Sequence, residues 1–218
     1  MPASEFVKAL DGIQRALRPS LKDQGFNVRG RTFNRVTDDG LTQVVNLQIG
    51  PSDPPGTTYV PGLTRNMHGL FTVNLGIYIP EVAEMSGGGP AKAWVQEYHC
   101  AIRTRLGQAG GSDQDIWWHA RDSSDVMADV QSLLLSYGLA FLDRFRSRDL
   151  ILAELEGHGE NLEHCAVPRI VSAIILTRRG KPDAARSLMA AQTQESRHNR
   201  NHPAYVRELA ERLGLGAI

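Results

Sequence analysis

The chain has 218 residues, enough for one large domain or for a domain with an appendage. Its hydrophobic fraction of 41% and charged fraction of 22% are those of an ordinary globular protein and argue against a disordered or fibrous class. Lys and Arg total 24, as do Asp and Glu, and no basic block of the kind that binds nucleic-acid phosphates stands out, so we expect no nucleic-acid partner.

The chain start and the cysteines bear on location. The first residues, Met1 to Glu5, lack the basic region and apolar segment of a secretory signal. The most apolar stretch, 133–142, falls well short of the roughly 20 residues of a membrane span. We therefore expect a cytoplasmic protein with no membrane partner. Cys100 and Cys165 have no C-x-x-C spacing and predict two buried, reduced thiols.

The N-terminal third predicts a helix followed by two strands. Apolar residues spaced by three and four predict a helix from Ser4 to Leu21, with Ser4 as its N-cap and one apolar face. After Gly25 the pattern becomes extended. It predicts a strand over 26–36 with a bulge at Gly30, then a turn at 38–40 and a strand over 41–49.

The middle of the chain continues the sheet. Strict alternation of apolar and polar residues predicts a strand over 71–79, and weaker patterns predict strands over 98–106 and 116–119. A long Pro/Gly-rich connection occupies 50–68, and a glycine loop at 86–90 precedes a segment, 91–96, that allows a short helix.

Beyond Arg121 the period becomes helical. Helices are predicted from 122–124 onward, with Gly138 as a kink or end, and over 147–155, 168–179 and 182–194, with a last helix after Pro203. The predicted fold class is α+β. An antiparallel sheet of four to five strands carries an N-terminal helix on one face and is followed by a C-terminal helical region. We expect an α+β domain over 1–156 and a helical tail over 157–218 that packs on it.

Four short motifs carry a family resemblance. They are Gly25-Phe26, Gly30 to Arg35, Val45 to Gln48, and Phe71 to Gly76. In this order they resemble the DUF4304 family of bacterial proteins of unknown function, over roughly the first 155 residues. The resemblance implies a shared α+β domain and no activity, cofactor or catalytic residue to carry over.

Three short segments partly resemble metal-binding or phosphate-binding sites. His198 and His202 have the spacing of a helical metal pair, but Pro203 interrupts an incoming helix. His164 and Cys165 with His158 match no metal-ligand spacing, and the loop at 87–90 lacks the context of a phosphate-binding loop. We therefore predict no metal ligand, no cofactor and no catalytic residue.

The polar face of the sheet is the remaining candidate. Opposite the apolar face, the strands present hydrogen-bonding groups with little net charge: Asn34, Asn46, Gln48, Asn74, Tyr78, His99 and Arg103. Such a face is often washed by solvent, and the helical tail could also cover it. Its residues also suit recognition of another protein.

The leading functional hypothesis is a non-enzymatic cytosolic binding protein, of the toxin-neutralising (immunity) kind, that uses the polar sheet face or the 50–68 loop. The alternative is an enzyme whose site lies between the sheet and the loops, with His99, His119, Tyr78 and Arg103 as acid, base or anion-binding groups. A third hypothesis is that the tail hairpin mediates dimerisation. The sequence leaves the oligomeric state open.

Overall fold

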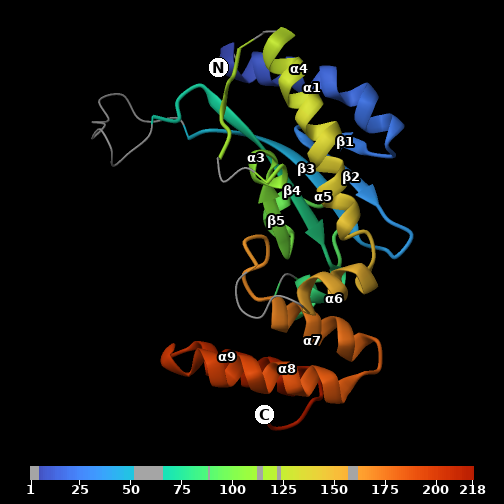
Figure 1. The fold of residues 1–218 in the computed structure, drawn as a ribbon, viewed down its shortest axis with the longest axis vertical. Coiled ribbons are helices and arrows are strands. Elements are labelled where there is room, and N and C mark those ends of the chain that lie inside the picture. The colour runs from blue at the N-terminus through green and yellow to red at the C-terminus, as the bar shows by residue number, and fades with distance from the viewer. Residues whose placement is uncertain (1–4, 52–65, 88, 112–114, 122–123, 157–161) are drawn as a thin grey trace. The chain divides into compact units, whose positions relative to one another are not determined.

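A computed structural model describes residues 5–51, 66–87, 89–111, 115–121, 124–156 and 162–218 (Figure 1). Ser4, most of the 50–68 connection and His158 lie outside these residues, so the expectations on them stay predictions. The chain forms two compact units. The first unit comprises residues 1–35, 44–75 and 104–142, and the second unit comprises 36–43, 76–103 and 143–218. The predicted boundary near residue 157 stays a prediction.

The structure confirms the antiparallel sheet and the α+β class. Its strand order is β1-β2-β3-β4-β5, and the short β6 also pairs with β4, with Leu70 opposite His119. The strands are β1 (Asn27–Arg29), β2 (Thr32–Val36), β3 (Thr42–Ile49), β4 (Leu70–Tyr78), β5 (Ile102–Arg105) and β6 (Trp118–His119). Every residue of β4 is buried, and β4 pairs with β3, β5 and β6, so this strand lies in the core.

The predicted bulge at Gly30 is wrong. Residues 27–36 form two short strands of a hairpin, in which Arg29 lies opposite Thr32. Gly30 occupies the turn with φ +60°, a conformation that glycine adopts without steric cost and that two-residue hairpin turns require. The phase slip in the sequence therefore marks a reversal of the chain.

The predicted strand over 98–106 is also wrong in its extent. Residues Glu97–His99 form a 3-10 turn, η1, and only Ile102–Arg105 form β5, before the short α3 (Leu106–Ala109). Tyr98, in the 3-10 turn, is 68% exposed. The His99 ring nitrogen Nδ1 accepts a hydrogen bond from the Gln96 N–H at 3.1 Å, a local bond that competes with strand pairing.

A short helix lies elsewhere than expected. The helix allowed at 91–96 is absent from these residues, which are all described. Instead α2 spans Pro80–Met85, directly after β4, with Pro80 in its first turn. Proline is suited to that position because it has no N–H to leave unpaired.

The first unit contains the helices nearest the sheet. As predicted, α1 (Glu5–Asp23) buries Leu10, Ile13, Leu17 and Leu21. It lies beside α4 (Ser124–Leu133), and Gln131 donates a hydrogen bond to the Ser20 hydroxyl at 2.8 Å (Figure 1). A π-helical turn, η2 (Leu134–Gly138), joins α4 to α5 (Leu139–Arg144) without a break. By length and composition alone the helix Ser124–Arg144 could also cross a membrane.

The second unit contains the C-terminal helices that the sequence predicts. They are α6 (Arg148–Glu156), α7 (Pro168–Arg178), α8 (Pro182–Glu195), the 3-10 turn η3 (Ser196–His198) and α9 (His202–Arg212). Helix α7 contacts both α6 and α8, and residues 170–175 are buried throughout (Figure 1). Helix α7 is therefore the interior element of this group.

Arg148 at the start of α6 joins three segments of the second unit. Its guanidinium contacts both carboxylate oxygens of Glu81, Nε to Oε1 at 2.6 Å and Nη2 to Oε2 at 2.8 Å. Its backbone N–H donates to Asp39 in the β2–β3 turn at 2.6 Å, and Nη1 donates to the Asp39 carbonyl. The Glu81 side chain is only 8% exposed, so its charge depends on this partner.

Loss of this guanidinium should strongly destabilise the fold. We expect Arg148→Met to lower the free energy of unfolding by about 3–5 kcal/mol, because Glu81 is then buried without its partner. Arg178→Met, which breaks the exposed pair with Glu84, should cost less than about 1 kcal/mol. Urea unfolding measures both. Equal losses would contradict the assignment, whereas adding Glu81→Met to Arg148→Met should recover much of the stability.

Two helical glycines should respond in opposite directions to alanine. A Cβ on Gly138 would lie 2.8 Å from Leu134 and 3.1 Å from Leu106, so Gly138→Ala should destabilise by about 1–3 kcal/mol. A Cβ on Gly12 would meet only the Arg15 tip, at 4.0 Å. Gly12→Ala should therefore stabilise α1 by up to about 1 kcal/mol. Urea unfolding of both variants tests the pair, and a stable Gly138→Ala would contradict the close packing.

Candidate functional site

Four of the seven residues predicted for the polar sheet face, Asn34, Asn46, Gln48 and Asn74, lie in the first unit, and Asn34 is only 6% exposed. Asn46 is half-buried, and its Nδ2 donates to the Thr32 hydroxyl at 2.9 Å. Asn74 is 4% exposed and donates to Oε1 of Gln48 at 2.7 Å. Gln48 itself is exposed. The structure thus brings Asn74 and Gln48 together but leaves Asn74 in the interior.

The other three lie in the second unit. Tyr78 is 1% exposed, and its hydroxyl accepts a hydrogen bond from the Lys92 N–H at 3.2 Å. His99 lies in η1, and burial, with a smaller effect of nearby Lys92, lowers the pKa of its imidazole. Arg103, on β5, pairs with Glu97. Their role as a binding surface stays a prediction.

The residues of the enzyme hypothesis are divided between the units. His119 is in β6 of the first unit, whereas Tyr78, His99 and Arg103 belong to the second unit. Tyr78 and His99 accept backbone hydrogen bonds, and Arg103 has an ion pair. The structure therefore assigns these groups local bonds that hold the chain in place.

The other chemical candidates are also placed. Cys100 and Cys165 are free and buried, as expected, and burial is the main reason why the pKa of each thiol is raised. His198 lies in η3, and Nε2 of His202 lies 3.2 Å from the Gln192 side chain. Within the described part of the chain no group of three or more His, Cys, Asp or Glu side chains is placed to hold a metal ion.

A groove in the second unit is the feature that the sequence did not predict. Helices α6, α7 and α8 line a volume of about 730 Å³. Apolar side chains from all three helices line it: Leu152, Ala153 and Leu155 of α6, Leu176 of α7, and Ala184 and Leu188 of α8. Leu152, Leu176 and Leu188 are half-buried, so they present apolar surface that no helix covers fully. We refer to this feature as the α6–α8 groove.

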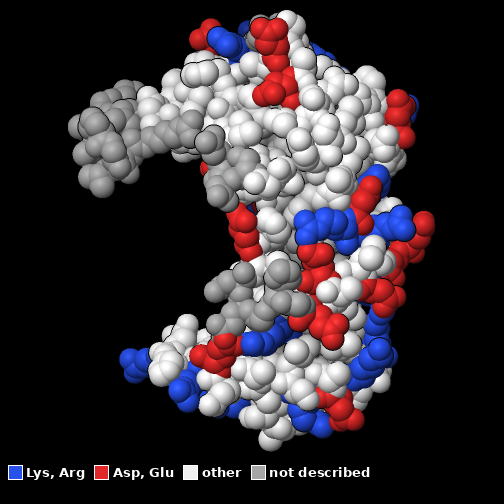
Figure 2. Space-filling model, in the orientation of Figure 1, with Lys and Arg blue, Asp and Glu red and all other residues white. Residues whose placement is uncertain are grey.

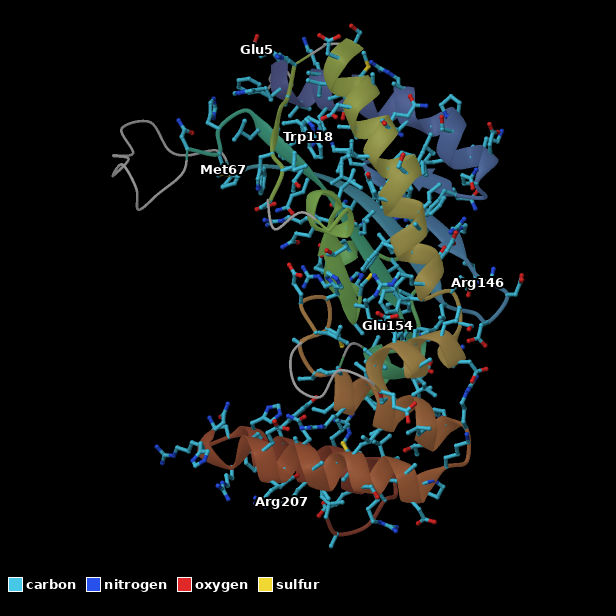
Figure 3. All side chains as sticks on the ribbon, in the orientation of Figure 1. Glu5, Met67, Trp118, Arg146, Glu154 and Arg207 are labelled. Atoms are coloured by element: carbon cyan, nitrogen blue, oxygen red, sulfur yellow. The ribbon has the colours of Figure 1, made fainter. Side chains whose placement is uncertain are left out.

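Charged side chains border the α6–α8 groove. Arg179, just after α7, pairs with Asp149 at the start of α6, and Arg169 in the first turn of α7 pairs with Glu195. Lys181 and Glu156 also line the groove. Figure 2 shows basic and acidic side chains next to one another over α6 and α7, and Figure 3 labels Glu154 of α6 in this region. An apolar floor with a charged rim is typical of a recognition surface.

Sequence periodicity predicted only part of the α6–α8 groove. It predicted the three helices, but the three half-buried leucines stand on different helices and only tertiary packing brings them together. The one available signal was that each of these helices has a leucine outside its most buried stripe.

Comparison with known proteins gives one finding. The family model described as "Domain of unknown function (DUF4304)" matches residues 63–144, a shorter span than the resemblance implied. No curated protein and no solved structure matches the chain. The matched segment runs from before β4 through α5, so the α6–α8 groove lies C-terminal to it.

Protonation of Asp149 should reveal the ion pair at the groove rim. The hydrogen bond from Arg179 lowers the pKa of the Asp149 carboxyl below its ordinary value. The pair therefore stabilises the fold above the unfolded-state pKa of Asp149, and this contribution is lost as the pH falls through the lower folded-state pKa. The contribution is small because the Asp149 side chain is largely exposed to solvent. We expect Arg179→Gln to raise the pKa of Asp149 in a carboxyl NMR titration. Arg178→Gln should leave that pKa unchanged, and an equal shift in both variants would contradict the pairing.

Proposed function

Residues 63–144 belong to the DUF4304 family, whose function is unknown, and we propose that the protein is a non-enzymatic binding protein whose α6–α8 groove receives an amphipathic helix of a protein partner. The observation that carries this proposal is the apolar floor contributed by three helices. The general hypothesis of a binding protein is the one that the sequence favoured, but the proposed surface differs. Toxin neutralisation stays a prediction within it.

The size of the groove suits a short helix. Its lining extends along α7 from Arg169 to Arg179, the residue that follows the helix. Ten steps of about 1.5 Å each make the groove about 15 Å long. Three turns of a partner helix have the same length. Leucines on such a helix at positions i, i+3, i+4 and i+7 would contact Leu152, Leu176 and Leu188.

The charges of the groove favour one kind of partner. Arg179 and Asp149 pair with each other, and Arg169 pairs with Glu195, so these charges are largely balanced. No ion pair to another described residue involves Lys181 or Glu156. A partner helix that carries an acidic residue facing Lys181 and a basic residue facing Glu156 would complement both.

The lining also bears on the enzyme alternative. General acid–base catalysis works best with groups whose pKa lies near neutral pH, such as His. The described residues that line the groove include no His, Cys or Tyr, and Asp149 has a lowered pKa. These properties support binding over proton transfer at this surface.

Photo-crosslinking can test the proposal. Cys100 and Cys165 are buried, so an engineered surface cysteine can be labelled selectively with a maleimide photo-crosslinker. Ala184→Cys places the probe at the groove, and Leu150→Cys places it on α6 at a 39% exposed residue that does not line the groove. In extracts of the source cells we expect an adduct with Ala184→Cys only, lost when Leu188→Glu is added. Mass spectrometry should locate the crosslink in an amphipathic helix of a different protein.

Three outcomes would contradict the proposal. They are equal adducts at both positions, an adduct unaffected by Leu188→Glu, and a crosslink to a second copy of this chain. The last would support the dimerisation hypothesis. Circular dichroism of the Leu188→Glu variant controls for loss of folding, since Leu188 is only half-buried.

A further inference from the structure

A second cavity lies in the first unit, beside the N-terminal half of α1. Its volume is about 570 Å³, and it is lined by α1 and by the two residues that follow β6. Figure 3 labels Glu5 at the start of α1 and Trp118 on the strand that leads to this segment. The lining residues are Glu5, Phe6, Lys8, Ala9, Gly12, Arg15, Ala120 and Arg121. We refer to it as the α1 cavity.

Three cations meet at the α1 cavity. Lys8 and Arg15 lie two turns apart on one face of α1, and Arg121, which follows β6, is also part of the lining. All three are exposed, and none has a hydrogen bond or ion pair from its side chain to another described residue. Glu5 is the single carboxylate of the lining. Three cations with only one carboxylate among them attract an anion.

Gly12 leaves room between these cations. It lies inside α1, where glycine costs about 1 kcal/mol relative to alanine. Packing does not require glycine there, because an added Cβ would meet only the Arg15 tip, at 4.0 Å. The missing side chain opens the space between Lys8 and Arg15, so a ligand can approach the helix closely.

Both walls of the cavity are held in place. A Cβ on Gly69 would lie 2.8 Å from the Phe6 ring, so Phe6 packs directly on that backbone. The Phe6 ring also meets His68 edge-on, with centroids 5.0 Å apart. On the other wall the Ala120 N–H donates to the Gly69 carbonyl at 2.7 Å. Phe6 and Ala120 thus give each wall a fixed apolar group next to the cations.

We propose that the α1 cavity binds a small phosphate monoester. Three cations and one carboxylate give the lining a net charge of about +2, which matches the charge of about −1.5 to −2 that a phosphate monoester carries near pH 7. The phosphate contacts Lys8, Arg15 and Arg121, and the organic group lies against Phe6 and Ala120. Guanidinium groups suit such contacts because they donate two parallel hydrogen bonds to phosphate oxygens. This site is independent of the α6–α8 groove.

Phenyl phosphate is a suitable probe, with phenol and inorganic phosphate as comparisons. We expect phenyl phosphate to bind with saturation in isothermal titration calorimetry and to shift the amide NMR signals of α1. Phenol should not bind, and inorganic phosphate should bind more weakly because it lacks the ring. Arg15→Gln and Arg121→Gln should each weaken binding about tenfold or more, as expected for loss of a charged hydrogen bond.

Matched variants separate this site from general charge effects. Arg18→Gln removes an exposed cation of the same helix that does not line the cavity, and it should leave the affinity for phenyl phosphate unchanged. Gly12→Leu should fill the space and abolish binding while α1 stays helical by circular dichroism. An equal loss with Arg18→Gln, or unchanged binding with Gly12→Leu, would overturn the proposal.

The remaining comparisons show whether the bound phosphate belongs to a soluble monoester, to inorganic phosphate or to a lipid. No saturable binding of phenyl phosphate below about 10 mM would overturn the site. Equal affinity for inorganic phosphate would overturn the assignment to a monoester. Vesicles of phosphatidylcholine with phosphatidic acid form the last arm. Binding to these vesicles without binding to phenyl phosphate would assign the cations to a membrane surface and overturn a soluble ligand.

Discussion

The bidentate contact between Arg148 and Glu81 is the interaction on which the second unit depends most. It joins the first residue of α6 to the first turn of α2, and Asp39 of the β2–β3 turn completes it. These segments are far apart in the sequence. Without this contact, polar groups at the end of each segment would lack part of their hydrogen-bond partners. Removing a carboxylate and a guanidinium from water is costly, and only fork-like geometry with further hydrogen bonds offsets that cost. The contact therefore fixes where α6 begins, and with it one wall of the α6–α8 groove.

The groove follows from how α7 is covered. Residues 170–175 are buried, so α7 needs neighbours on nearly all sides, and α2, α6 and α8 all contact it. Along the groove, α6 and α8 leave an open strip above α7, because the ridges of neighbouring helices fill only the nearest grooves. Leu176 lies in that strip and stays half-buried. The exposed pair of Asp149 and Arg179 adds little stability there, since solvent screens it, but it keeps polar groups at the rim.

Periodicity was enough to predict the longer regular elements. The apolar stripe of α1 and the alternation of β4 each arise from residues close together in the sequence. The errors arose where another interaction overrode a local pattern. Gly30 reverses the chain, and the bond between His99 and the Gln96 N–H replaces strand pairing.

Alternation in β4 showed which side chains share a face but not what covers that face. The Thr72 hydroxyl donates to the Ile116 carbonyl, so the polar face of β4 is in the interior there. Neither the groove nor the cavity could be predicted, because each joins residues from separate elements.

The two proposed sites depend on different physical forces, and only one of them includes residues of the segment that the family model matches. The groove offers apolar area, so binding there would gain from removing leucine side chains from water and would change little with ionic strength. The cavity adds three cations to the apolar surface of Phe6 and Ala120, so its affinity would fall as salt screens the charges. Residues 63–144 contribute Ala120 and Arg121 to the cavity, whereas the groove lies entirely beyond residue 144. The family segment therefore takes part directly in the proposed anion site, whereas the α6–α8 groove is a separate feature of the C-terminal helices. The two linings share no residue, so ligands of the two sites would not compete for the same side chains.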